Sequence, residues 1–517
     1  MMWTRALNRA GLRGRDDSRH FRTDHLKAEL GSRTARGGVA TLTSQGFKFF
    51  ISMAATVVLA RLLTPQDYGL VGMVAVVTGF VSIFKDMGLA IATIQKEEIN
   101  GKQISTLFWI NVTLSILVML VTTAIAPALA WFYGEPRLTL ITIGFAGALL
   151  FGGLTVQHEA LLRRQMKFTA LAVLEIGSLI AGIVAAVVFA WHGARYWALV
   201  INQLVQAITY AAAVWIVCGW VPGWPVRTAG VRSMFAFGGN LTGFHVINYF
   251  ARNLDNMLIG KFWGSWQLGI YAKAYQLLLL PIDQINYPIA AVAIPALSRL
   301  NDSPERYRKA YLRMIEKIAI LTMPGMAFMI MTSDWIVAIV LGPQWSQAAR
   351  VFALLGIAGL VQPVANTTGW LFMSQNRAHH MFQWGIIGGM LAILSIIAGL
   401  HWGAIGVAAS YSLTNVAVVI PLLFYFVGRA GPVHTTDFYR TMAAPASAAL
   451  LTMLALLMFR HWVNSINPTA GLIIAFGLTF VTAFFVLVVL PSGRLLLRDG
   501  ITMISLLTKS KPAISGS

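Results

Sequence analysis

Long apolar stretches separated by short polar turns fill most of this 517-residue chain. From Gly38 on, fourteen such stretches of roughly 20–25 residues are each long enough to cross the hydrocarbon core of a bilayer as a helix. Their approximate limits are 39–61, 68–92, 104–131, 138–160, 168–190, 195–218, 234–260, 267–297, 311–341, 347–373, 379–400, 403–427, 439–460 and 468–490. The stretch at 311–341 is the least regular, because Pro324 and the polar run 332–334 predict a kink or an early end.

A hairpin pattern near the start of the chain recurs about 200 residues later. The segment 58–70 corresponds to 258–270, with basic residues and glycines at the same turn positions. A second correspondence, between 191–194 and 401–404, has an offset of 210. The pattern predicts two halves of six helices each, followed by two more helices. Because six is even, both halves enter the membrane from the same side, an arrangement compatible with rocking between two states.

The predicted fold class is therefore an all-α polytopic membrane protein. We expect about 14 transmembrane helices, arranged as two parallel six-helix lobes plus two extra helices. The expected segments are a basic cytoplasmic tail at 1–37, an N-lobe at 38–218, a cytoplasmic linker at 219–233, a C-lobe at 234–428, two further helices at 429–491 and a cytoplasmic tail at 492–517.

Composition supports a membrane protein, since 57% of the residues are hydrophobic and only 11% are charged. A soluble protein would carry about 25% charged residues. The net charge of +20 could suggest nucleic-acid binding, but no folded soluble domain carries the basic residues. If the N-terminus is cytoplasmic, 29 of the 39 Lys and Arg residues lie in the tails and inner loops and 6 lie in the outer loops. The positive-inside rule then predicts that both termini are cytoplasmic.

The first 36 residues contain nine Lys or Arg residues and no apolar run. A cleavable signal peptide needs an apolar core of about 7–15 residues. We therefore expect a basic tail that is attracted to anionic lipid headgroups on the cytoplasmic side, so that membrane lipids are partners.

The apolar stretches that precede the two equivalent turns each carry polar residues on one helical face. In the first stretch these include Gln45 and Lys48, and in the second His245, Asn248 and Arg252. Spacings of three and four residues place each set on one side of its helix. Polar faces at equivalent places predict two halves that face one polar cavity.

A charged side chain inside a bilayer costs at least about 2.5–3.5 kcal/mol, so each should face a cavity or a partner. We predict a positively charged cavity that binds an anionic headgroup through Lys48, Arg252, Lys273, Gln45, His245 and Asn248. Coupling or gating is assigned to Asp255, Asp283, Lys85, Asp86 and Glu175. The alternative is structural: ion pairs, chiefly between Arg252 and Asp255, and lysines that reach back to the interface.

Other polar residues have simpler interpretations. We interpret His158, Glu159, Arg163 and Arg164, at the inner end of one stretch, as interface anchors. The alternative is that they contact the substrate at the cytoplasmic entrance. Cys218 is the only cysteine, which excludes an intramolecular disulfide and a cysteine-built metal site. The sequence contains no nucleophile elbow, no phosphate-binding loop and no helix with metal-ligand spacing. We therefore expect a protein that is not an enzyme and has no metal site.

Two hairpin sequences resemble a known transporter family. Residues 61–70 (RLLTPQDYGL), followed by 86–89 (DMGL), are similar to the first hairpin of Wzx-type polysaccharide exporters, flippases of the multidrug/oligosaccharidyl-lipid/polysaccharide superfamily. Residues 253–260 (NLDNMLIG) and 268–271 (LGIY) resemble the same family, nearest to its WzxC-like colanic-acid and lipopolysaccharide exporters.

This resemblance implies two six-helix lobes around a cationic cavity in the bacterial inner membrane. It further implies that undecaprenyl-pyrophosphate-linked oligosaccharide or polysaccharide precursor moves from the cytoplasmic to the periplasmic leaflet by alternating access. The residues support such a mechanism, since Lys48, Arg252 and Lys273 could attract phosphates while the lipid tail stays in the bilayer. An inside-negative potential favours outward movement of negative charge by about 2.3 kcal/mol per charge per 100 mV.

The expected partners are the lipid-linked glycan, membrane lipids and the polysaccharide polymerase or export machinery, acting with a monomer. No cofactor and no nucleic acid are expected, and the coupling ion, H⁺ or Na⁺, is left open.

Three alternative functions differ from a polysaccharide exporter in the charges and loops that they would require. A MATE-like drug or cation antiporter of the same superfamily would need an acidic cavity, and acidic residues are scarce in the apolar stretches. A membrane-embedded polysaccharide polymerase, ligase or glycosyltransferase should carry a large outer loop with catalytic residues. A structural scaffold would not need buried charges in both halves.

Overall fold

The computed structural model describes residues 30–85, 89–96, 99–226, 232–462, 467–489 and 493–494. Within these ranges the regular elements are helices and no strand occurs, as the all-α prediction requires. Nine helices in this part of the chain are long and apolar enough to cross a membrane, or up to eleven if each of two bent pairs is one span. The polytopic all-α class is confirmed, while the count of fourteen stays a prediction.

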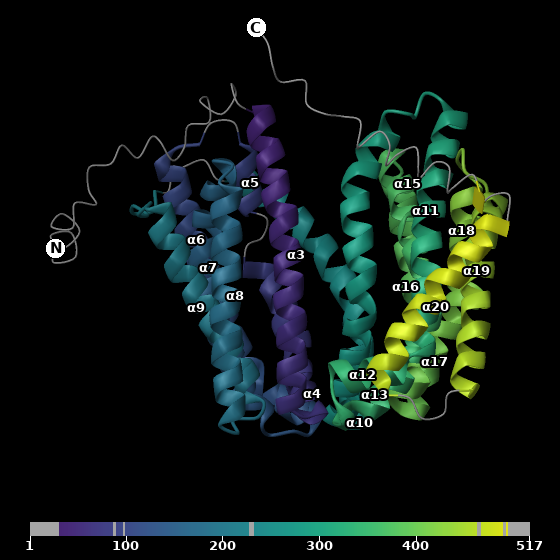
Figure 1. Ribbon diagram of the computed structural model, residues 1–517. Helices are drawn as coiled ribbons and strands as arrows, with labels where there is room; N and C mark the ends of the chain where they lie inside the picture. The colour runs from purple at the N-terminus through teal and green to yellow at the C-terminus, as the bar shows by residue number, and fades with distance from the viewer. Residues whose placement is uncertain are drawn as a thin grey trace, which may run out of the picture. The chain divides into compact units, whose positions relative to one another are not determined.

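The chain divides into two compact units, Met1–Ser265 and Trp266–Ser517. The lobe limits expected from the sequence remain a prediction. In the first unit the helices are α3 (Leu30–Leu62), α4 (Pro65–Ser82), the short η2 (Ile83–Lys85), α5 (Leu89–Gln95), α6 (Gly101–Tyr133), α7 (Leu138–Arg164), α8 (Phe168–Trp191) and α9 (Trp197–Cys218). Helix α7 packs on α6 and α9, and α8 packs on α9 and α3, as Figure 1 shows in purple and blue.

The turn between α3 and α4 is fixed by a capping box. The Thr64 side chain accepts from the Asp67 amide, and the Asp67 carboxylate accepts from the Thr64 amide at 2.9 Å. Pro65 occupies the first turn of α4, where its missing N–H is not needed. Asp67 also accepts from the amide of Tyr196 at 3.1 Å, so this carboxylate joins the start of α4 to the start of α9.

Helix α10 (Arg232–Ser298) breaks at Gly264, whose φ of 76° is not helical. A side chain at this φ would be strained, whereas glycine adopts it readily. The break lies between the two stretches expected at 234–260 and 267–297, so this predicted boundary is confirmed.

The second unit contains α11 (Pro304–Met331), α12 (Ser333–Val340), η3 (Pro343–Trp345), α13 (Ser346–Gly359), α14 (Gln362–Asn366), α15 (Thr368–Ser374), α16 (Ala378–Gly399), η4 (Leu400–Trp402), α17 (Gly403–Thr414), η5 (Asn415–Val419), α18 (Ile420–Gly428), α19 (Thr435–Trp462) and α20 (Pro468–Val489). The irregular stretch ends early, as predicted, because α11 stops at Met331 before the polar run. Pro324 lies inside α11 without ending it. The stretch at 403–427 is not one regular helix, since the π-helical turn η5 interrupts it just before Pro421.

Equivalent turns in the two units have equivalent backbone conformations. Met166, after α7, has a φ of 56°, and Asn376, 210 residues later, has a φ of 54°. Gly193 and Gly403, also 210 apart, have φ values of 79° and 68°. The offset of 210 read from the sequence therefore recurs in the backbone.

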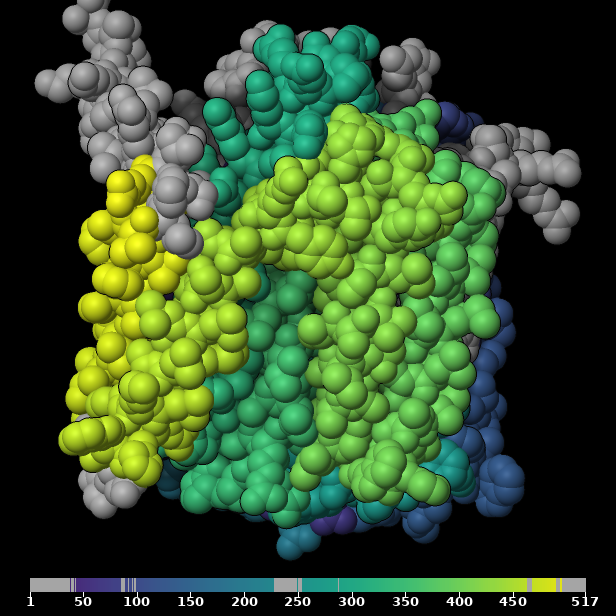
Figure 2. Space-filling view, turned by 90° about the vertical axis from the view of Figure 1, so that its right-hand side faces the viewer, coloured from purple at the N-terminus to yellow at the C-terminus, as the bar shows by residue number. Residues whose placement is uncertain are grey.

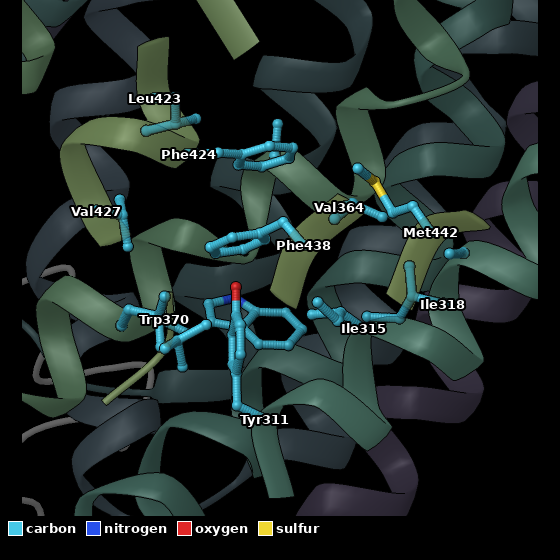
Figure 3. Close-up of a cluster of buried hydrophobic side chains, with 14 of the residues drawn as sticks. Tyr311, Ile315, Ile318, Val364, Trp370, Leu423, Phe424, Val427, Phe438 and Met442 are labelled. Carbon is cyan, nitrogen blue, oxygen red and sulfur yellow. The ribbon is translucent and has the colours of Figure 1, made fainter. Parts of the chain in front are cut away.

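The core of the second unit is an aromatic and aliphatic cluster (Figure 3). Phe424 of α18 stacks on Phe438 of α19, with ring centroids 4.3 Å apart. Beside them Tyr311 of α11 is completely buried, and its hydroxyl lies 2.7 Å from the hydroxyl of Thr367. This cluster joins α11, α18 and α19 into one packed body.

Two arginine–aspartate pairs fix α19 to the rest of the second unit. Near one end, Arg308 Nε donates to Asp437 at 2.8 Å. At the other, Arg460 contacts Asp334 with distances of 2.8 and 2.6 Å and lies over the ring of Trp335. Figure 2 shows α19 in yellow-green passing across teal α11, with yellow α20 beside it.

Candidate functional site

A charged pair joins α3 to α8 inside the first unit. Lys48 Nζ donates to the carboxylate of Glu175, 127 residues away. Glu175 is the only charged residue in the 24-residue helix α8. An isolated charge in such a helix would be costly, so the partner on the neighbouring helix accounts for its presence.

A second pair on α7 lies beside the first. Arg163 donates to Glu159 one helical turn earlier, through Nε at 2.9 Å and Nη2 at 2.7 Å. The same Nη2 lies 3.9 Å from the free carboxylate oxygen of Glu175. Tyr210 of α9 lines the same cavity as Glu159. The four charged groups therefore form one network across three helices.

Lys48, Glu159 and Glu175 of this network line a cavity of about 480 Å³, and Arg163 is not part of the lining. Apart from the charged groups, the lining is rich in hydroxyl and amide groups: it consists of Lys48, Ser52, Glu159, Glu175, Ser178, Leu179, Gln203, Gln206, Ala207 and Tyr210. The volume is within the range of about 300–1,000 Å³ that is typical of small-molecule sites. Glu159 lies near the end of α7, and Glu175, Ser178 and Leu179 lie in the first half of α8, so the cavity is closer to the turn between α7 and α8 than to the opposite ends of these two helices.

The network contains two carboxylates and two cations, so it carries no large net charge. Hydroxyl and amide side chains both donate and accept hydrogen bonds, which suits a ligand rich in hydroxyl groups. The lysine and the arginine provide the positive groups that an anion would need. In the residues that the structure describes, no group of three or more His, Cys, Asp or Glu is arranged to hold a metal ion.

The structure brings two of the predicted residues, Lys48 and Glu175, into direct contact. Gln45, one turn before Lys48, is exposed and is not part of the cavity lining. The predictions for Arg252, His245, Asn248 and Lys85 concern side chains outside the described part of the structure, and Asp86 is outside it entirely.

Three predicted residues on α10 are described but do not line this cavity. Asp255 is buried, and its carboxylate accepts from the Asn256 amide at 2.7 Å. Lys273 is buried and donates to Gln276 at 2.9 Å. Asp283 is exposed. Their proposed roles in binding, coupling or gating remain predictions.

For two of the four α7 residues, His158 and Arg164, the interpretation as interface anchors is wrong. His158 is completely buried, and its ring stacks on Trp215 with a centroid distance of 4.3 Å. Arg164 is also buried and donates to carbonyls of Thr93 and Ile94 at the end of α5, which satisfies groups that a helix end leaves free. Glu159 and Arg163, as described above, belong to the cavity network.

The sequence interpretation also missed the contribution of α9. Gln203, Gln206 and Tyr210 all line the cavity. Their spacing of three and four residues places them on one face of a mostly apolar helix. That polar face is the signal in the sequence that would have identified them.

Comparisons with known proteins agree with the resemblance in the hairpin sequences. The model of a family described as "Polysaccharide biosynthesis protein" matches residues 58–350. The lipopolysaccharide biosynthesis protein WzxC of Escherichia coli (strain K12) is 26% identical over 386 residues, covering 73% of this chain and 77% of WzxC. The teichuronic acid biosynthesis protein TuaB of Bacillus subtilis (strain 168) is 28% identical over 358 residues, covering 68% and 72%.

A solved structure, the lipid II flippase MurJ in an inward closed conformation, has a similar fold. Its TM-score is 0.69 at 13% sequence identity, and the match covers 87% of this chain and 98% of that chain. The chain thus has a fold similar to that of MurJ, with several membrane-spanning helices.

Proposed function

Because this chain belongs to the polysaccharide biosynthesis protein family, we propose that it is a flippase for lipid-linked glycans. It moves an undecaprenyl-pyrophosphate-linked oligosaccharide or polysaccharide precursor from the cytoplasmic to the periplasmic leaflet of the bacterial inner membrane by alternating access. The observation that carries the proposal is the cavity with paired charges among the apolar helices of the first unit. The names of WzxC and TuaB and the fold shared with a lipid II flippase support it.

A lipid-linked glycan needs such a site because its headgroup cannot cross hydrocarbon unaided. Hydroxyl-rich sugars find hydrogen-bonding partners in Gln203, Gln206 and Tyr210, and phosphates find positive groups in Lys48 and Arg163. The lipid tail needs no site in the cavity, since it stays in the bilayer. Hydrogen bonds and ion pairs formed in the cavity replace those that the headgroup loses on leaving water.

The proposed orientation places both termini in the cytoplasm, as the distribution of basic residues indicates. The cavity then lies in the cytoplasmic half of the first unit, where the substrate is loaded. A cation or drug antiporter is less well supported, because Lys48 and Arg163 balance the two carboxylates of the cavity.

The test is the substitution Lys48→Ala in bacteria whose surface polysaccharide depends on this protein. We expect surface polymer to fall about tenfold, because the substitution removes a positive group that would bind the phosphates, and a tenfold loss of affinity corresponds to ~1.4 kcal/mol. Lipid-linked precursor should accumulate in the cytoplasmic leaflet. The measurement is oxidation of its glycan by periodate, which does not cross the membrane: precursor in the cytoplasmic leaflet is oxidised only after the cells are opened.

The matched control is Lys102→Ala, which removes an exposed lysine at the start of α6, outside the cavity. It should leave polymer and precursor unchanged. Normal polymer with Lys48→Ala at normal protein levels would exclude the cavity as the substrate site. Accumulation of precursor in the outer leaflet instead would indicate a polymerase or ligase.

A further inference from the structure

The carboxylate of Glu175 is placed where an anionic ligand of the cavity would be held. One of its oxygens is bound by Lys48, and the other faces Arg163 at 3.9 Å. A phosphate group at this position would likewise present one oxygen to Lys48 and another to Arg163.

Lys48 and Glu175 line the cavity, and Arg163 lies within 3.9 Å of Glu175. The side chains of Lys48, Glu175 and Arg163 are 22%, 30% and 42% exposed, so none is sealed in the core. Arg163 is also held by Glu159, and therefore stays in place if Glu175 moves. Lys48, in contrast, has Glu175 as its ion-pair partner among the described residues.

An empty cavity that exposed a lone lysine among apolar helices would be unstable, since an unpaired charge there is costly. Glu175 removes this cost when no substrate is present. When an anion binds, it can pair with Lys48 while Glu175 turns toward Arg163. Every charged group then still has a partner. On release, Glu175 returns to Lys48.

We propose that Glu175 occupies the phosphate position of the empty cavity, and that a phosphate group of the substrate displaces it from Lys48. This inference rests on the proposed function, because it assigns the phosphate subsite of the same cavity. It makes Glu175 a positioning residue that competes with the substrate. A cationic ligand is disfavoured, because it would have to compete with Lys48 for the carboxylate.

The experiment measures binding of farnesyl diphosphate, a short isoprenyl diphosphate, to the purified full-length protein in nanodiscs of neutral lipid. The variant Glu175→Gln keeps the shape of the side chain but removes the competing charge. We expect its affinity to be about tenfold higher than that of the wild type, since one ion pair no longer has to be broken. The variant Glu175→Asp, which is one methylene shorter, should show a smaller gain and covers the case in which Glu175→Gln does not fold.

Three further arms separate the possible outcomes. Glu135→Gln removes a carboxylate that is paired with Arg137 away from the cavity, and should leave the affinity unchanged. The double variant Lys48→Ala/Glu175→Gln should lose the gain, because the gain arises at Lys48. Inorganic pyrophosphate, and nanodiscs that contain phosphatidylglycerol, test whether a free phosphate or a phospholipid headgroup competes with farnesyl diphosphate. Equal competition would assign the subsite to phosphate groups in general.

An unchanged or lower affinity in both Glu175 variants, with reduced affinity in Lys48→Ala, would overturn this inference and leave the proposed function standing. If Lys48→Ala also binds farnesyl diphosphate as the wild type does, the cavity assignment itself is wrong.

Discussion

Gly69 of α4 packs directly against Ser265, the last residue of the first unit. A Cβ atom at this position would overlap the backbone carbonyl of Ser265. We expect Gly69→Ala to lower the free energy of unfolding by about 1–3 kcal/mol or more, because backbone atoms cannot move aside as a flexible side chain can. The measurement is the thermal unfolding midpoint of the purified protein in detergent.

The control for this prediction is Gly177→Ala. Gly177 lies in α8, is exposed, and has no atom within 4 Å of a Cβ built on it. Its substitution should be neutral or slightly stabilising, since alanine is the better helix former. Equal midpoints for the two variants would show that the contact between α4 and Ser265 is not tight.

At the same scale, the sequence marks Lys48 and Glu175 as charges within apolar stretches but does not show that they pair. Lys48 and Glu175 were singled out because each is a charge in an apolar stretch, yet they were assigned separate roles. Their contact joins residues 127 apart, and no local pattern encodes which helix packs on which. Lys48 therefore belongs to a balanced network and not to a purely positive surface.

Helix α19 shows how one element is anchored at its first turn. Asp437 is almost fully buried and accepts both from the His434 amide at 2.8 Å and from Arg308. We expect Asp437→Ala to destabilise the protein by about 1–3 kcal/mol, because it removes a helix cap and leaves Arg308 without its partner. Thermal unfolding in detergent measures the effect.

The other end of α19 offers the matched comparison. Asp334 also pairs with an arginine, Arg460, but its side chain is 47% exposed. Its substitution by alanine should cost no more than about 1 kcal/mol, as is usual for exposed pairs. A larger loss for Asp334→Ala than for Asp437→Ala would contradict the argument from burial.

The limits of elements were predictable where a local signal marks them. The turn residues around Thr64 and the glycine at 264 are such signals, and the structure has breaks at both. The internal repeat also predicted equivalent turns 210 residues apart. The π-helical turn at Asn415–Val419 also has a local signal, because Pro421 lacks an N–H and its ring clashes with the carbonyl four residues earlier, but the apolar pattern alone did not reveal the turn.

For the whole molecule, hydrophobic stretches and charge determine the class and the proposed orientation, because the bilayer acts on every helix alike. The position of the cavity depends instead on packing among α3, α7, α8 and α9. Those contacts depend on side-chain shape, and the polar face of one helix does not predict which helix packs against it.

The proposed orientation leads to a test on the two ends of one helix. Helix α8 has 24 residues, so it is about 36 Å long and exceeds the roughly 30 Å of a bilayer core. Exposed Lys167 precedes it and exposed His192 follows it. With both termini cytoplasmic, Lys167 lies inside and His192 lies outside.

The measurement uses single cysteines in a background without the native thiol. Cys218 is the only cysteine and is buried, and Cys218→Ala removes it with the loss of little more than one buried sulfur atom. In this background, His192→Cys should react with a membrane-impermeant maleimide in spheroplasts, while Lys167→Cys should react only after the membrane is opened. The reversed pattern would place the cavity in the periplasmic half and reverse the direction of loading. Reaction of both cysteines in intact spheroplasts would mean that α8 does not cross the membrane, and the transport mechanism would then fail.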